Sequence, residues 1–243
     1  MTRTPKAKKL YDLRVGRGQA TTVPIDRVRK RLDELHALGL TNHMIARAAG
    51  VTPTCLNFIE QRNTVHTRFD VAARIFTVDH RPHPNQGTVL TIGARRRVRA
   101  LNAIGWPTND LAHRLGQRDR CVLNLAIGKP TMTYGLWARI QDLYNELSGT
   151  PGPSSRSILV AKRSGHVPPL AWDGIDIDDP RAQPDWAAAG IKLTERPVCV
   201  NNHPYTPANT FRDNRGNRQC RTCHRAATER QRVKRGSRSK SAA

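Results

Sequence analysis

The chain is poor in aromatic and apolar residues, and this limits the core it can build. Aromatic residues make up 5% and apolar residues 37% of its 243 residues, below the roughly 45–50% apolar content of average globular chains. One large core is therefore excluded in favour of several small ones. No apolar run approaches the roughly 18 residues of a membrane span. No apolar stretch follows the basic start MTRTPKAKKL, so no signal peptide is expected.

Acidic residues are also scarce, with 19 Asp and Glu against 41 Lys and Arg, so the net charge is +22. A surplus of this size repels itself unless a polyanion is the partner, and nucleic acid is the first candidate before an anionic membrane surface. The surplus is uneven: the net charge is +5, +2, +7, −2 and +10 over residues 1–22, 23–80, 81–156, 157–195 and 196–243.

Cysteines are few, and their placement favours metal binding over disulfides. Three of the five lie near the C-terminus, and two of those form a CxxC pair. This pattern is typical of an intracellular metal site. A cytoplasmic protein is therefore expected.

An internal repeat is the most informative feature, because residues 29–63 match residues 95–129 at an offset of 66. Aligned pairs are Arg29 with Arg95, Leu35 with Leu101, Gly39 with Gly105, Gly50 with Gly116, and Cys55 with Cys121. After one deletion, AARI (72–75) falls on WARI (137–140). A shared apolar register with two aligned glycines indicates a duplicated structural unit.

Each repeat predicts three short helices. Helix starts and ends of the first repeat are marked by Gly39, Thr41, Gly50, Thr52 and Pro53. The third helix is expected to be buried through Leu56 and Ile59, and its copy through Val122 and Leu125. Cys55 and Cys121 are expected to be small buried hydrophobes in the same register.

The segment GLTNHMIARAAGVTPTCLNFIEQRN closely resembles the helix-turn-helix of the Xre/Cro-like repressor family. GWPTNDLAHRLGQRDRCVLNLAIGK resembles it more loosely, since Gln117 replaces the apolar residue after the turn and Pro107 the capping threonine. The whole is similar to tandem helix-turn-helix proteins of actinobacteria and their phages. This resemblance implies a mostly α fold with the third helix of each unit in the DNA major groove.

That layout nominates side chains that would meet DNA. In the first unit they are Asn42, Thr52, Thr54, Asn57 and Arg62; in the second they are Thr108, Arg118, Arg120, Asn124 and Lys129. Asparagine can pair with adenine, threonine can contact a thymine methyl, and arginine can read guanine. The alternatives are a solvated polar face on a plain helical bundle and a second unit that is partly structural. Because one chain carries two helix-turn-helix units of different sequence, the predicted DNA target is a bipartite, non-palindromic site.

A metal site is predicted near the C-terminus, where Cys199, His203, Cys220 and Cys223 form the pattern C-x3-H-x16-C-x2-C. Three thiolates and an imidazole suit structural Zn²⁺ in tetrahedral geometry. A short hairpin and then a basic helix over residues 221–234 predict a treble-clef plan. Alternatives are His224 as a substitute ligand and a basic tail with incidental cysteines.

The stretch CVNNHPYTPANTFRDNRGNRQCRTCHR resembles an element of actinobacterial and actinophage proteins, some of them HNH-endonuclease-like. A nuclease of that type needs a histidine base and further metal ligands. His203 is expected to be consumed as a zinc ligand, and no acidic cluster accompanies it. Residues 212–240 instead hold eleven basic and two acidic residues, which suits DNA-backbone binding.

The domain prediction is a basic arm (1–22), two helix-turn-helix units (23–80 and 81–148), a proline-containing acidic linker (149–195), a zinc module (196–235) and a disordered tail (236–243). The linker is expected to be a spacer. Alternatively, its aspartates contact a partner such as RNA polymerase or fold back on the basic regions; they are Asp173, Asp176, Asp178 and Asp179.

These patterns together predict a protein that is not an enzyme and not a membrane protein. The function expected is sequence-specific binding of double-stranded DNA in transcriptional regulation. Two alternatives stay open: an HNH-type endonuclease targeted by the helix-turn-helix units, and an architectural or replication-associated DNA binder.

Overall fold

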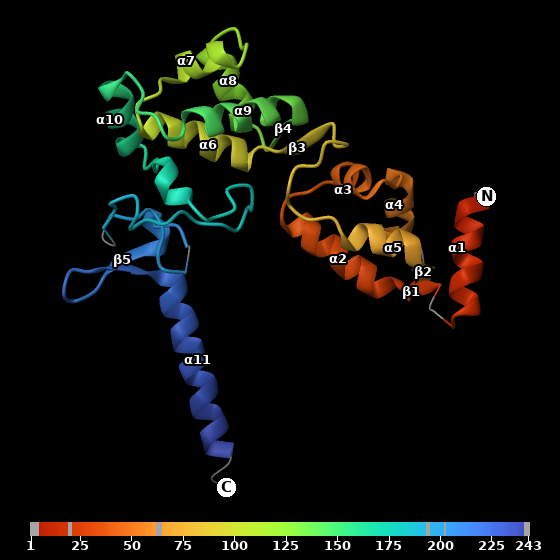
Figure 1. Ribbon diagram of the computed structural model, residues 1–243. Helices are drawn as coiled ribbons and strands as arrows, with labels where there is room; N and C mark the ends of the chain where they lie inside the picture. Colours follow the sequence, from red (N-terminus) through yellow and green to blue (C-terminus); the bar gives the residue numbers. More distant parts are fainter. Residues whose placement is uncertain (1–4, 19–20, 62–64, 193–194, 202, 241–243) are drawn as a thin grey trace.

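The chain is mostly helical in its computed structural model (Figure 1), which describes every residue except 1–4, 19–20, 62–64, 193–194, 202 and 241–243. Short antiparallel strand pairs connect the helices. Within the described residues, no helix is long and apolar enough to cross a membrane. Helix α1 (Pro5–Gly16) precedes the first repeat unit in the chain.

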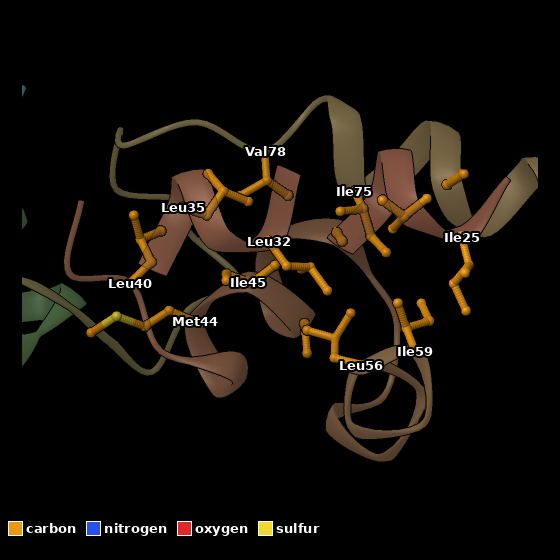
Figure 2. Close-up of a cluster of buried hydrophobic side chains, with 14 residues drawn as sticks. Ile25, Leu32, Leu35, Leu40, Met44, Ile45, Leu56, Ile59, Ile75 and Val78 are labelled. Carbon is orange, nitrogen blue, oxygen red and sulfur yellow. The ribbon is translucent and has the colours of Figure 1, made fainter. Parts of the chain in front are cut away.

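Within its described residues, unit 1 is a group of four helices with two short strands that pair with each other. Its elements are β1 (Thr22–Pro24), α2 (Ile25–Ala37), α3 (Asn42–Ala49), α4 (Pro53–Gln61), β2 (His66–Arg68) and α5 (Phe69–Phe76). Strand β1 pairs with β2, with Val23 opposite Thr67, so the start of the unit is joined to its end. The side chains of Figure 2 gather between α2, α3, α4 and α5, and Leu32, Ile45 and Leu56 are fully buried.

The helix boundaries predicted for unit 1 are confirmed. Gly39 and Gly50 adopt φ values of +95° and +64°, which only glycine adopts at little cost. The Thr41 hydroxyl accepts a hydrogen bond from the Met44 N–H at 3.4 Å, and the Thr52 hydroxyl accepts one from the Cys55 N–H at 3.2 Å. Both threonines therefore satisfy N–H groups that a helix start leaves unpaired.

Unit 2 repeats this order of elements. They are β3 (Thr88–Leu90), α6 (Ile92–Ala103), α7 (Thr108–Arg114), α8 (Arg120–Gly128), β4 (Thr131–Thr133) and α9 (Tyr134–Leu147). Strand β3 pairs with β4, with Val89 opposite Met132. The repeat thus covers both whole units and extends beyond the aligned segments 29–63 and 95–129.

The expected register of the third helix in unit 2 is wrong by one residue. Leu123 and Ile127 are buried, whereas Val122 and Leu125 are 39% and 64% exposed. The cause is a turn that is one residue longer after Gly116 than after Gly50. As a result Asp119 caps α8, accepting hydrogen bonds from the N–H groups of residues 121 and 122 at 2.7 and 3.1 Å.

Residues 149–192 are not a linker, because they pack on unit 2. The Gly152 N–H donates a hydrogen bond to the Ile104 carbonyl at 2.8 Å. The Trp106 indole N–H donates to the Thr150 carbonyl at 2.9 Å. A Cβ on Gly152 would clash with the carbonyl group of Gly105, so the two backbones are in contact. Here glycine permits close packing, and helix α10 (Ser155–Arg163) follows directly.

The acidic segment is likewise no spacer, and the fold-back alternative is confirmed. Both Asp178 carboxylate oxygens accept hydrogen bonds from the Arg97 guanidinium, at 2.8 and 2.7 Å. The Trp137 indole N–H donates to the same carboxylate at 3.0 Å. Asp176 accepts from the Arg81 guanidinium at 3.0 Å. Around these contacts the 3₁₀ helix η1 (Pro169–Trp172) and neighbouring residues build a third small core.

The C-terminal part consists of a hairpin and a long helix. Its elements are η2 (Pro207–Asn209), β5 (Thr210–Arg212), β6 (Arg218–Cys220) and α11 (Arg221–Lys240). Strands β5 and β6 pair with Thr210 opposite Cys220. Helix α11 projects away from the other elements (Figure 1). Residues 236–240, expected to be disordered, are helical, and the rest of the expected tail lies outside the described residues.

The substitution Asp178→Ala tests whether the acidic segment is part of unit 2. It would leave the Arg97 guanidinium, 5% exposed, without its carboxylate, and losing one partner of a buried ion pair costs about 3–5 kcal/mol. We expect that loss in the free energy of unfolding measured by urea titration. Asp142→Ala, at an exposed position on α9, is the control and should change stability by less than about 0.5 kcal/mol. Equal stability of the two variants would contradict the packing of this segment.

Candidate nucleic-acid interface and metal centre

The first group of candidate DNA contacts lies on α4 and the turn before it. Thr52, Thr54 and Asn57 are all exposed. Thr54 and Asn57 are three residues apart, so they share one face of the helix. The Thr52 hydroxyl caps α4, as described above. Arg62 lies outside the described residues.

Asn42, at the start of α3, is joined to α4 by hydrogen bonds. Its side-chain N–H₂ donates to the Asn57 carboxamide oxygen at 3.1 Å and to the Glu60 carboxylate at 2.8 Å. The other Glu60 oxygen lies 3.0 Å from Nε2 of His36, whose Nδ1 lies 2.8 Å from the Leu40 carbonyl oxygen. The network orients the Asn57 side chain, whose amide N–H₂ has no hydrogen-bond partner among the described residues.

Glu60 and His36 were not among the residues nominated from the sequence. Glu60 lies within the segment that carries the family resemblance, whereas His36 lies on α2 before it. Their connection joins α2, α3 and α4, so no spacing within one helix indicates it.

An arginine of the first helix caps the third helix in both units. The Arg29 Nε–H donates to the Ile59 carbonyl at 2.8 Å. The Arg95 Nε–H donates to the Ile127 carbonyl at 2.6 Å, and its guanidinium reaches the Lys129 carbonyl at 3.0 Å. A cation at a helix C-terminus satisfies free carbonyls and opposes the helix dipole. The two aligned arginines therefore hold α4 and α8 in equivalent positions.

The corrected register of α8 changes which residues of the two units correspond. Counted from the first helical residue, Asn124 of α8 is the equivalent of Asn57 of α4, and both are exposed. Arg120 is the first residue of α8 and Arg118 lies in the turn before it. Lys129 follows the helix. All three of these basic side chains are exposed.

Thr108 differs from its counterpart Asn42. It is half-buried, and its hydroxyl lies 3.2 Å from the Asn102 side-chain nitrogen, so it is used within unit 2. The structure brings Thr108 together with Arg120 and Asn124 along one groove, whereas Arg118 and Lys129 do not line it. Of the five candidate DNA contacts in unit 2, three therefore line this groove and two lie outside it.

The four residues of the predicted metal site converge. One ligand atom from each of Cys199, His203, Cys220 and Cys223 lies within 4.8 Å of every other. The Cys199 sulfur lies 3.5 Å from His203 Nδ1 and 3.5 Å from the Cys223 sulfur, and His203 Nδ1 lies 3.2 Å from the Cys223 sulfur. A tetrahedral ion with bonds of 2.0–2.3 Å requires ligand separations of about 3.5–3.8 Å. The cluster can therefore hold a metal ion.

Two asparagines support the cluster from outside. The Asn201 amide donates to the Cys223 sulfur at 3.3 Å, and the Asn209 amide donates to the Cys220 sulfur at 3.4 Å. Burial raises the pKa of Cys220, but hydrogen bonds from the Cys223 backbone N–H and from Asn209 outweigh burial and lower that pKa to about 6. These contacts favour the thiolate, which is the form that binds metal.

His224 is not part of this cluster, because its ring lies edge-on against Phe211 with centroids 5.4 Å apart. The His203 ring directs Nδ1 at the cysteine sulfurs, as a metal ligand would.

Comparison of the chain with protein-family models, with curated proteins and with solved structures finds no match.

The reactivity of two cysteines reports the register of the third helices. Cys121, expected to be buried, is exposed, whereas Cys55 is half-buried against the core of unit 1 and its pKa is raised by burial. Because the thiolate is the reactive form, we expect iodoacetamide to alkylate Cys121 markedly faster than Cys55 in the native protein. Peptide mass mapping after timed quenching measures both rates. Faster alkylation of Cys55 would contradict the register found for α8.

Proposed function

We propose that the protein binds double-stranded DNA sequence-specifically and acts as a transcriptional regulator. The observation that carries this proposal is the duplicated unit, in which a short helix, a glycine turn and a second helix with exposed polar side chains recur. We assign α3 with α4, and α7 with α8, as helix-turn-helix pairs, of which the second helix enters the major groove. The net charge of +22 supports a polyanionic partner.

Unit 1 is best suited to read bases. Asn57 is held by Asn42, so its free amide is oriented before DNA arrives, and asparagine recognises adenine through N6 and N7. Thr54 is positioned one turn away to contact a neighbouring base pair. Residues 23–80 have a net charge of only +2, so the selectivity of this unit would come from these contacts more than from charge.

The C-terminal module supports the same function. We infer that the cluster holds structural Zn²⁺ in a treble-clef-like arrangement, since three sulfurs and one nitrogen suit that ion. Cys220 ends β6 and Cys223 lies in the first turn of α11, so the ion would fix the start of this helix. Described side chains on α11 include four exposed arginines, Arg221, Arg225, Arg230 and Arg232. They would contact phosphates along the DNA backbone.

Loss of one cysteine should remove the metal and unfold the module. We expect wild-type protein to retain one zinc per chain after dialysis and Cys220→Ala to retain none. The apparent binding free energy of structural zinc, about 10–16 kcal/mol, is also the folding energy of such modules. Atomic emission measures the zinc, and circular dichroism should show less helix. Cys121→Ala, an exposed cysteine outside the cluster, is the control. One zinc retained by Cys220→Ala would contradict the assignment.

The substitution Asn57→Ala tests sequence reading. Losing a bidentate contact costs about 1–3 kcal/mol of base discrimination. We therefore expect about 10- to 100-fold weaker binding to the preferred site and unchanged binding to scrambled DNA. Selection from a random duplex library gives the site, and titrations give the affinities. Asn145→Ala, an exposed asparagine on α9, is the control. If wild-type protein enriches no motif, specific regulation is wrong and an architectural binder remains.

A further inference from the structure

A groove of about 600 Å³ lies between α8 and α10. Arg95, Arg99 and Asn102 of α6 line it at spacings of four and three residues, so one face of α6 contributes to it. Helix α8 contributes Arg120 and Asn124. The opposite side is the first part of α10, with Arg156 and Ser157 among its lining residues. Unit 1 lacks a counterpart of α10 among the described residues, since the chain passes from α5 through residues 77–87 to β3 without a further helix.

The groove carries uncompensated positive charge. Arg95 is used on the carbonyls at the end of α8. Arg99, Arg120 and Arg156 have no hydrogen-bond or ion-pair partner within the part of the chain that the structure describes. None of the described lining residues is acidic. The pKa of Arg99 is lowered, first by burial and then by the positive charge of the neighbouring Arg95.

Two further features fit an anionic ligand. The first turn of α10 opens toward the groove, and a helix N-terminus carries partial positive charge. His166 also lines the groove, and its Nδ1 is buried with no hydrogen-bond partner among the described residues. Burial and then Arg99 lower the pKa of His166, which favours the neutral ring. One of its nitrogens is then an N–H donor.

The lining residues favour a sugar–phosphate backbone over a nucleotide. The described lining residues include no Phe, Tyr or Trp, so the groove offers a base no large aromatic ring on which to stack. The three unpaired arginines come from three different helices, α6, α8 and α10, so they line the groove from several sides. Guanidinium groups bind phosphate oxygens in a bidentate manner.

We propose that this groove is a phosphate-binding site for the DNA backbone, so that unit 2 grips DNA while unit 1 reads bases. The inference deepens the proposed function and rests on it. It assigns Arg99 and Arg156, which were not among the nominated contacts, to the interface, and it gives Arg120 a phosphate rather than a guanine. The second wall comes from residues 149–192, which complete the site in unit 2 alone.

The test compares two variants that each lose three positive charges. The groove variant is Arg99→Gln, Arg120→Gln and Arg156→Gln. The control is Arg163→Gln, Arg181→Gln and Lys192→Gln, all exposed and outside the groove. Each lost phosphate contact lowers the slope of log affinity against log salt by about 0.9, so the groove variant should lose about 2 to 3 in slope. The ratio of the DNA affinity of wild-type protein to that of the groove variant should then fall about 40-fold between 50 and 200 mM salt.

The preferred sequence should be the same for wild-type protein and the groove variant in random-duplex selection. The single variant Arg156→Gln should lose about 1 in slope, which keeps the test valid if the triple variant fails to fold. Equal slopes for groove and control variants refute the groove while leaving DNA binding intact. A changed motif also refutes it, because Arg120 or its neighbours would then read bases. Wild-type protein that binds no duplex refutes the proposed function itself.

A small phosphate compound in solution is the other ligand that could supply phosphate groups to these arginines. Isothermal titration with ATP and with pyrophosphate, with and without DNA, distinguishes the two. Competition between pyrophosphate and DNA at millimolar concentration supports a backbone site. The opposite result is that ATP binds at micromolar concentration to wild-type protein but not to the groove variant, without being displaced by DNA. That result overturns the DNA-backbone site in favour of a small-molecule site.

Discussion

The ion pair between Arg97 and Asp178 determines how unit 2 is completed. Arg97 lies on α6 and is 5% exposed, and a guanidinium buried to that extent requires a carboxylate partner. No carboxylate of the unit itself supplies one. The acidic segment must therefore fold back across α6, where the Trp137 indole N–H and two Arg97 hydrogen bonds hold Asp178. Gly93 permits this approach, because a Cβ there would clash with the Asp178 carboxylate.

The run of arginines on α6 shows that basic residues here are not interchangeable. Arg95 caps α8, and Arg97 pairs with Asp178. Arg96 donates to the carbonyls of residues 177, 179 and 182 and lies 4.8 Å above the Trp172 ring. Arg99 lines the groove without a protein partner. Much of the +7 of residues 81–156 thus serves the fold, and net charge alone overstates the surface offered to a polyanion.

The features of this fold that the sequence predicts correctly are those set by local signals. The ends of α3 and α4 follow from Thr41, Gly50 and Thr52, since capping and left-handed turns involve neighbouring residues only. The metal cluster was equally predictable, because coordination geometry restricts how cysteines and histidine are spaced. These predictions needed no knowledge of distant contacts.

The errors arose where a distant contact decides the structure. One extra residue before Asp119 rotates α8, so Leu123 is buried in place of Val122, and offset counting cannot detect this. The composition of residues 148–157 favours a linker, yet Gly152 serves contact with Gly105. The glycine and proline content of residues 148–157 is compatible both with a flexible linker and with a tightly packed segment. Only the partner, more than 40 residues away, distinguishes the two.

These differences make the two units unequal in a way that follows from the fold. In unit 1 the polar face of α4 is open, and a hydrogen-bond network orients Asn57. In unit 2 the equivalent Asn124 shares a groove with unpaired arginines and with α10 as a second wall. A preorganised amide favours discrimination between bases, whereas fixed guanidinium groups favour any phosphate. The two units thus differ in what they expose, an oriented amide in unit 1 and unpaired guanidinium groups in unit 2, and under the proposed function this would separate base selectivity from phosphate binding.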